Sequence, residues 1–302
     1  MKKRLIIDGS NALHRAFWVS QNGKKSFEDV YDVGPIYIFL KFLKSVVDRF
    51  KPDETWVAWD KRIKHPSTNF RKELLKDVYK QNRDTEKSEK VHEYHDKLVQ
   101  WVESLGVYQL YPFVLEADDV MSWIAADNRE GTNIIVTVDK DLLQLVSENT
   151  FYYNPVKKVL IDKTNFEELV GVKPENFLLY KAILGDVSDN IVGISGYGVQ
   201  KSKKLSSLPV NDIKNKLTEQ DWETLNLNLK IMDLSASYNL ENGEVECYKN
   251  QLVKQLDSIK PNIKNFELLA ENNGMYSISR KVGEWRQTFV TGNSLISLLA
   301  QL

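Results

Sequence analysis

The sequence contains a single cysteine, Cys247, among its 302 residues. An internal disulfide is therefore excluded, and since nothing in the chain requires an oxidising compartment we expect a cytoplasmic protein. The sequence also lacks an apolar run of the roughly 20 residues that a membrane-spanning helix needs. Asp8 interrupts the first apolar stretch, where a signal peptide would need continuous hydrophobicity. We therefore expect neither membrane insertion nor export.

Net charge is also nearly absent, because 41 basic residues meet 42 acidic ones. The global basic excess of many nucleic-acid-binding proteins is missing, but the basic residues are unevenly distributed. Eight Lys or Arg and two acids fall within residues 61–83, and five Lys and one Asp within residues 199–216. Such basic segments are most often solvated surface, but they also suit an anionic polymer as partner. The apolar share of 42% predicts a globular chain, and the length of 302 residues favours about two domains.

Strand and helix patterns alternate along the first half of the chain. Apolar runs that end in an aspartate occupy residues 5–7, 55–59 and 133–138, and apolar residues at helical spacing occupy residues 36–50, 91–105 and 117–129. This alternation predicts an α/β fold with a mainly parallel sheet and helices on both faces. A hairpin is expected over residues 151–161, followed by a helix that Thr164 opens with Glu167 at capping-box spacing. We expect an α/β domain over residues 1–173 and a helical region over residues 174–302.

Acidic residues stand at turns or strand ends of this predicted fold. They are Asp8, Asp60, Glu116, Asp118, Asp119, Asp139, Asp141, Asp186 and Asp189. Each alone is better explained as a turn former or helix cap, but a parallel sheet gathers such positions at the carboxyl ends of its strands. Crowded carboxylates need a cation, and oxygen ligands without nearby Cys or His suit Mg²⁺ or Mn²⁺. Two such ions, about 4 Å apart, suit phosphodiester hydrolysis without a protein nucleophile.

Four sequence blocks, taken in order, carry a resemblance to a known family. They are LIIDGSN at 5–11, EADD at 116–119, TVDKDLLQL at 137–145 and LGDVSDNI at 184–191. Together they resemble the 5'-nuclease or flap endonuclease family, which includes phage 5'-3' exonucleases and the amino-terminal nuclease domain of bacterial repair polymerases. The resemblance covers roughly residues 1–235. It implies a PIN-like fold, a helical arch at about 61–97 and a helix-three-turn-helix at about 184–208.

The resemblance also implies roles for individual residues. One metal site would be built by Asp8, Asp60, Glu116, Asp118 and Asp119, and the second by Asp139, Asp141, Asp186 and Asp189. At the base of the arch, Lys80 and Arg83 would contact the scissile phosphate and Tyr79 would stack on a base. The cofactors implied are two Mg²⁺ ions, for which Mn²⁺ substitutes.

The segment 191–205 resembles the family's duplex-binding element. The glycines Gly193, Gly196 and Gly198 would let backbone amides approach phosphates, and the loop's carbonyls would hold K⁺. Valine stands at 192 where proline is common and glutamine at 200 where lysine is common. The phosphate contact is therefore expected at Lys201, with Lys203 beside it.

The implied function is a structure-specific 5'-nuclease that cuts 5' flaps and degrades nucleic acid in the 5'-3' direction. Its partners would be DNA with a 5' flap or a 5' end, RNA primers on DNA, and replication proteins. It would remove the RNA primers during replication by an RNase H activity. No polymerase domain is found in the sequence, so we expect the protein to act alone. The alternatives are a DNA-junction binding protein with little or no nuclease activity and a small ribonuclease of the related toxin-like fold.

Overall fold

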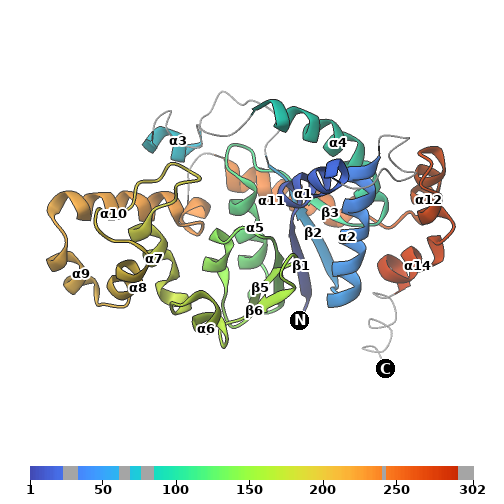
Figure 1. Cartoon of the computed structure of the whole chain (residues 1–302). Helices are drawn as coiled ribbons and strands as arrows, with labels where there is room; N and C mark the ends of the chain where they lie inside the picture. The colour runs from blue at the N-terminus through green and yellow to red at the C-terminus, as the bar shows by residue number, and fades with distance from the viewer. Residues whose placement is uncertain (23–32, 61–68, 76–84, 240–242, 292–302) are drawn as a thin grey trace.

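The computed structural model describes residues 1–22, 33–60, 69–75, 85–239 and 243–291 (Figure 1). The described residues form one six-stranded sheet in the order β3-β2-β1-β4-β5-β6. Its strands are β1 (Lys3–Asp8), β2 (Glu54–Ala58), β3 (Tyr108–Leu110), β4 (Thr132–Val136), β5 (Thr150–Asn154) and β6 (Val159–Ile161). All neighbouring pairs are parallel except β5 and β6, which form the expected antiparallel hairpin.

Helices cover both faces of the sheet, as predicted (Figure 1). Successive β1 residues point to opposite faces, so Leu5 and Ile7 join one buried cluster while Ile6 joins the other. The first cluster receives side chains from α1 (Gly9–Asn22), α2 (Gly34–Phe50) and α4 (Thr85–Ser104). The second receives them from α5 (Ala117–Ala126), η3 (Asp141–Leu145), α6 (Phe166–Val170) and α11 (Glu244–Ser258). The α/β fold class is confirmed.

The order in which strands are added to the sheet reverses between its two central strands, β1 and β4. From β1 the chain adds β2 and then β3 on one side, and it returns to add β4 on the other side of β1. In sheets of this kind, ligands bind outside the carboxyl ends of the strands at such a switch point. Here the switch point lies between Asp8, the last residue of β1, and Thr137, which directly follows β4.

A separate helical cluster follows the sheet and lies at the left of Figure 1. It consists of α7 (Phe177–Leu184), α8 (Val199–Ser206), α9 (Val210–Lys216) and α10 (Glu219–Met232), after the short η4 (Pro174–Asn176). Its core contains Ile183, Ile194 and Leu225. After η5 (Ala236–Asn239) the chain returns to the sheet, where α12 (Ile263–Asn272), α13 (Tyr276–Ser279), α14 (Val282–Arg286) and η6 (Gln287–Thr291) join the first cluster. The domain boundary at residue 173 stays a prediction.

Two local details differ from expectation. Strand β3 was not predicted, since three residues are too short for periodicity to register. The predicted capping box at Thr164 is wrong, because the Thr164 hydroxyl donates to Asp162 at 2.6 Å and α6 begins after Asn165. The expected arch at 61–97 contains α3 (Phe70–Leu75) and part of α4, but residues 61–68 and 76–84 lie outside the described ones. None of the described helices is long and apolar enough to span a membrane.

Candidate metal centre

Asp8 is the acid at the switch point of the sheet. Its carboxylate accepts one hydrogen bond from the backbone amide of Asn11 at 2.9 Å and one from the hydroxyl of Thr137 at 2.8 Å. The second bond joins the end of β1 to the end of β4. Burial raises the pKa of Asp8 to about 7, and the negative charges of Asp60 and Asp139 add to this effect. A carboxyl held at this pKa is one that a cation would stabilise in its charged form.

Asp139 and Asp141 follow β4 on the turn into η3. The Asp139 carboxylate accepts a hydrogen bond from the backbone amide of Asp141 at 2.9 Å, which fixes the Asp139 side chain relative to the backbone at Asp141. Burial raises the pKa of Asp139, and the charges of Asp141 and Asp189 raise it further. Acids from β1, from the end of β4 and from the loop after α7 therefore share one electrostatic environment.

Lys181, on α7, connects two of these acids. Its ammonium lies 2.7 Å from Asp141 and 2.6 Å from Asp186. Burial alone would lower the pKa of Lys181, but the two carboxylates raise it above its usual range. Burial alone would raise the pKa of the Asp186 carboxyl, but hydrogen bonds from Lys181 and Ser188 hold that pKa below its ordinary value. Two acids of the predicted second group, Asp141 and Asp186, are thus brought together by one lysine.

The acids of the EADD block lie at the amino end of α5. Glu116 is the N-cap, and its backbone amide donates to Asp119 at 3.2 Å. The amide of Ala117 donates to Asp60, which follows β2, at 3.3 Å. Glu116 and Asp118 also line a narrow pocket together with Asp141 and Asp189. Members of the two predicted groups therefore line the same pocket.

Asp119 differs from the other acids. Its side chain is fully buried, and both carboxylate oxygens accept hydrogen bonds from the guanidinium of Arg71, at 2.7 and 2.8 Å. The Nε of Arg71 donates to the carbonyl of Ile231 at the end of α10, at 2.9 Å. Arg71 thus joins α3, α5 and α10, and the carboxylate of Asp119 is already bound by a cation from the protein itself.

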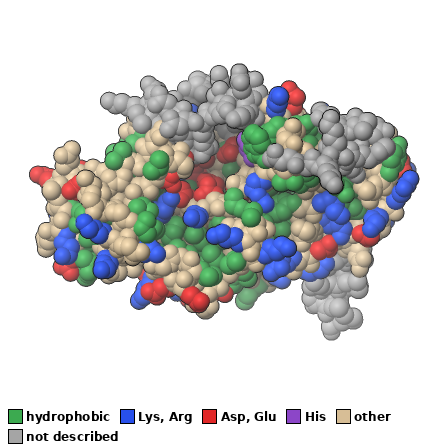
Figure 2. All heavy atoms as spheres, in the orientation of Figure 1, with side chains coloured by type: hydrophobic (Ala, Val, Ile, Leu, Met, Phe, Trp, Pro, Cys, Tyr) green, Lys and Arg blue, Asp and Glu red, His purple; other side chains and the backbone are tan. Residues whose placement is uncertain are grey.

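The donor chemistry of this edge fits a hard divalent cation, because all candidate ligands are carboxylates. Among the described residues, no group of three or more His, Cys, Asp or Glu side chains is close enough together, as placed here, to hold a metal ion. The raised pKa values of Asp8 and Asp139 arise from burial and mutual repulsion, and a bound cation would offset both. Figure 2 shows Asp and Glu side chains gathered in a hollow near the middle of the face, between the helical cluster and the sheet.

The segment between α7 and α8 is a tight loop that begins beside these acids. Asp186 pairs with Ile191 in a short antiparallel bridge. Gly193 lies against the end of α7, since a β-carbon there would be 2.1 Å from the carbonyl oxygen of Leu184. Gly196 has a positive φ of 78° and, like Gly198, has open space where a side chain would be. The exposed glycines precede the first turn of α8, as the sequence suggested.

The two lysines predicted to meet phosphate have different surroundings on α8. Lys201 is exposed. Lys203 is half-buried, and its ammonium donates to the carbonyl of Val170, at the end of α6, at 3.3 Å. The predicted arch residues Tyr79, Lys80 and Arg83 lie outside the described residues.

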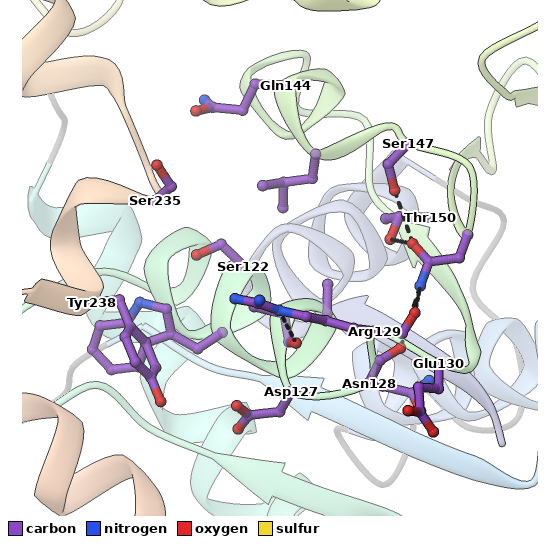
Figure 3. Close-up of a pocket in the computed structure, with 15 residues that line it drawn as sticks. Ser122, Asp127, Asn128, Arg129, Glu130, Gln144, Ser147, Thr150, Ser235 and Tyr238 are labelled. Carbon is purple, nitrogen blue, oxygen red and sulfur yellow. Dashed lines mark hydrogen bonds between the residues drawn. The ribbon is translucent and has the colours of Figure 1, made fainter. Parts of the chain in front are cut away.

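A larger pocket, of about 960 Å³, lies elsewhere (Figure 3). It is lined by the end of α5 and the residues after it, including Asp127 and Arg129, by Gln144 of η3, by Thr150 at the start of β5 and by Tyr238. None of the nine predicted acids is among its lining residues. It lies next to the amino end of β5 and therefore away from the edge where ligands of parallel sheets bind.

Three residues of the site were not predicted from the sequence. Lys181 carried a usable signal, because it is the one charged residue of the apolar segment Phe177–Leu184 and lies five residues before Asp186. Arg71 could not be distinguished from the other basic residues around it. The role of Thr137 could not be predicted, because hydroxyl residues are common at strand ends.

Asp8 should make the stability of the protein depend on pH. Its carboxyl has a pKa of 3.8 in the unfolded chain and about 7 in the folded protein, so between these values the folded state binds more protons and its stability falls as pH rises. Asp8→Asn removes this loss. At pH 8 in EDTA we expect the variant to be more stable than the unmodified protein by roughly 2 kcal/mol, with the advantage shrinking towards pH 4. Urea unfolding at several pH values measures it, and an equal difference at pH 5 and pH 8 would contradict the assignment.

The mainly parallel sheet, the carboxylates at its switch point and the glycine-bearing loop between α7 and α8 are the features expected above of a 5'-nuclease. The chain belongs to the 5'-3' exonuclease family: the family model described as "5'-3' exonuclease, N-terminal resolvase-like domain" matches residues 3–171. The family predicted from the four sequence blocks is therefore confirmed.

Individual relatives agree with this assignment. The 5'-3' exonuclease of Buchnera aphidicola subsp. Schizaphis graminum is 25% identical over 283 residues, which cover 86% of this chain and 96% of the relative. DNA polymerase I of Lactococcus lactis subsp. lactis is 32% identical over 220 residues, which cover 67% of this chain but 23% of the polymerase. Among solved structures, the bacteriophage T5 flap endonuclease in a pseudo-enzyme-product complex with DNA and metal ions has a TM-score of 0.64 at 21% identity, covering 84% of this chain and 99% of that one. This last likeness shows the shared fold.

Proposed function

We propose that the protein is a structure-specific 5'-nuclease that cuts 5' flaps and degrades nucleic acid from 5' ends by metal-dependent phosphodiester hydrolysis. The observation that carries this proposal is the joint electrostatic environment of Asp8, Asp139 and Asp141 at the switch point of the sheet. Membership of the 5'-3' exonuclease family supports it, as does the presence of DNA and metal ions in the complex of the T5 protein.

We assign eight of the acids to two Mg²⁺ ions, for which Mn²⁺ would substitute. Asp8, Asp60, Glu116 and Asp118 would hold one ion, and Asp139, Asp141, Asp186 and Asp189 the other. We leave Asp119 out of the ligand set because its oxygens are bound by Arg71. When bound, such ions supply a nucleophilic hydroxide at neutral pH and stabilise the leaving oxygen.

The protein's own residues have separate tasks in this proposal. The Thr137 hydroxyl fixes the orientation of the Asp8 carboxylate. Lys181 holds Asp141 and Asp186 close together until a metal ion takes its place at one of them. Lys80 and Arg83 would contact the scissile phosphate, and Tyr79 would stack on the neighbouring base. The loop with Gly196 and Gly198 would approach the phosphates of the duplex and hold K⁺ by its carbonyls.

A replication role fits this activity. A segment of DNA polymerase I of Lactococcus lactis subsp. lactis matches this chain over 220 residues. Hydroxide attack on phosphorus with departure of the 3' oxygen would leave a 5'-phosphate and a 3'-hydroxyl, ends that suit ligation after primer removal. We therefore propose RNA primers on DNA and 5' flaps as substrates.

A labelled-substrate assay tests the proposal. A duplex with a 5' flap should be cut near the junction in Mg²⁺ or Mn²⁺, and chelation by EDTA should abolish cutting while binding persists. If the protein binds the flap but cuts it neither in Mg²⁺ nor in Mn²⁺, it is instead a DNA-junction binding protein.

The two lysines on α8 give a matched comparison for duplex binding. Lys201→Ala should weaken binding to duplex DNA and lower the slope of log affinity against log salt by about one, because one phosphate contact is lost. Lys203→Ala should leave that slope nearly unchanged, since its ammonium is bonded to the Val170 carbonyl. Fluorescence anisotropy at several salt concentrations measures both. Equal slopes for the two variants would contradict this assignment.

A further inference from the structure

Strand β3 lies at the edge of the sheet and pairs with β2 on one side only. On that side its register places Tyr108 opposite Trp56 and Leu110 opposite Ala58. Backbone groups on the other side of an edge strand are unpaired unless another part of the protein covers them. In this protein the covering element is α11, whose residues lie about 140 positions further along the chain.

Side chains of α11 bond the outer backbone groups of β3 and the loop after it. The side-chain oxygen of Gln255 accepts from the amide of Gln109 at 3.0 Å. Gln251 accepts from the amide of Tyr111 at 3.0 Å and donates to its carbonyl at 2.8 Å. These two glutamines lie four residues apart on one face of the helix, and the strand positions they meet alternate, as the geometry of helix and strand requires.

Glu244 continues this series at the start of α11. Its side chain is 1% exposed, and its two carboxylate oxygens accept from the backbone amides of Phe113 and Val114. Residues 113 and 114 belong to the loop that leads directly into Glu116, the N-cap of α5. At the other end of α5, the hydroxyl of Tyr248 donates to Asp127 at 2.8 Å. Helix α11 therefore binds both the loop before α5 and Asp127, the C-cap of α5.

The chemistry of Glu244 differs from that of the two glutamines. Neutral side chains suffice to cover the edge at Gln109 and Tyr111, but the loop next to the acids is bound by a buried carboxylate. Burial raises the pKa of Glu244, and the charge of Asp119 adds to the rise, while the amides of the loop act against it. Burying a carboxylate beside other acids costs free energy, which its hydrogen bonds must offset. That cost is consistent with a need to fix the position of this loop.

We propose that Glu244 is a positioning residue of the metal centre, which holds the loop 113–115 so that Glu116 and Asp118 reach the divalent cation. This inference rests on the proposed metal-dependent function and gives the carboxyl-terminal part of the chain a role in it. Partners that orient metal ligands, without touching the metal, commonly change metal affinity by about 10- to 100-fold when they are replaced.

The experiment compares Glu244→Gln with the matched control Glu246→Gln. Both glutamates lie in the first turn of α11, but Glu246 is exposed. The amide of Gln presents one acceptor where the two loop amides need two. Binding of Mn²⁺ is measured directly by electron paramagnetic resonance, and cleavage of a 5' flap is measured as a function of Mn²⁺ concentration.

For Glu244→Gln we expect Mn²⁺ to bind about 10-fold more weakly. The Mn²⁺ concentration for half-maximal cleavage should rise by a similar factor, while affinity for flap DNA in EDTA stays unchanged. Glu246→Gln should match the unmodified protein in all three measurements. If Glu244→Gln does not fold, Gln251→Met, which releases Tyr111 on the same edge, should weaken Mn²⁺ binding in the same direction by a smaller factor.

The outcomes separate this inference from the proposed function. Unchanged Mn²⁺ binding in Glu244→Gln, or in Gln251→Met where that variant replaces it, would overturn the inference even if thermal stability falls, since the contact would then be structural only. An unmodified protein that cuts no flap in Mn²⁺ would overturn the proposed function and this inference with it.

Discussion

Replacing Asp139 by Asn is expected to lower the rate of flap cleavage by roughly 10³-fold while the affinity for the same DNA in EDTA is retained. The charge of Asp139 interacts with Asp8 of one proposed ligand group and with Asp141 and Asp189 of the other, so its loss changes the electrostatic environment of both groups. The substitution conserves size, and the neutral amide relieves repulsion with Asp141. The folded protein should therefore remain intact while the proposed metal centre loses its central ligand.

Single-turnover cleavage of a labelled flap measures the rate, and anisotropy in EDTA measures binding. Asp257→Asn, the same chemical change at an exposed position of α11, is the control and should leave both values unchanged. A parallel loss of cleavage and binding in Asp139→Asn would contradict a separation between metal centre and duplex contacts.

Replacing Arg71 by Met is expected to destabilise the folded protein by about 3–5 kcal/mol. The substitution removes both hydrogen bonds to Asp119 and leaves its fully buried carboxylate without this cation. It also releases the Ile231 carbonyl from Nε. Urea unfolding in EDTA measures the loss, and cleavage should fall as well, because α3 is no longer fixed to α5.

A double-variant comparison tests the physical reason. Arg71→Met combined with Asp119→Leu removes the unpaired charge, so most of the lost stability should return. Saturating Mn²⁺ should leave the stability difference between Arg71→Met and the unmodified protein unchanged, since Asp119 is not proposed as a ligand. If Mn²⁺ instead restores the stability of Arg71→Met, Asp119 belongs in the ligand set.

The sheet and the candidate acids could be predicted because each depends on a local signal. The runs before Asp8, Asp60 and Asp139 are short and apolar, and each ends in an acid. Once the strands are taken as parallel, their ends must meet at one edge. The pairing of Asp8 with Thr137 across the switch point follows from this topology, although the particular hydroxyl does not.

Contacts between distant segments could not be predicted. Asp119 has the same sequence context as Asp118, and only the folded position of Arg71, 48 residues earlier, distinguishes a buried ion pair from a candidate ligand. Glu244 likewise gives no signal in the sequence, because the loop amides that it accepts from lie about 130 residues away. Lys203 was predicted from its place in a basic helix, but the direction of its side chain depends on how α8 packs against the end of α6.

We propose that acids at the end of β1, after β2 and β4, at the start of α5 and in the loop after α7 hold two divalent ions. A crystal soaked in Mn²⁺ and measured for anomalous scattering tests it most directly. Two peaks are expected about 4 Å apart, one near Asp8 and Glu116 and one near Asp141 and Asp186, with the ammonium of Lys181 displaced from at least one carboxylate. Diffraction that places Mn²⁺ away from these residues, or shows no peak among them at saturating Mn²⁺, would contradict the two-ion assignment.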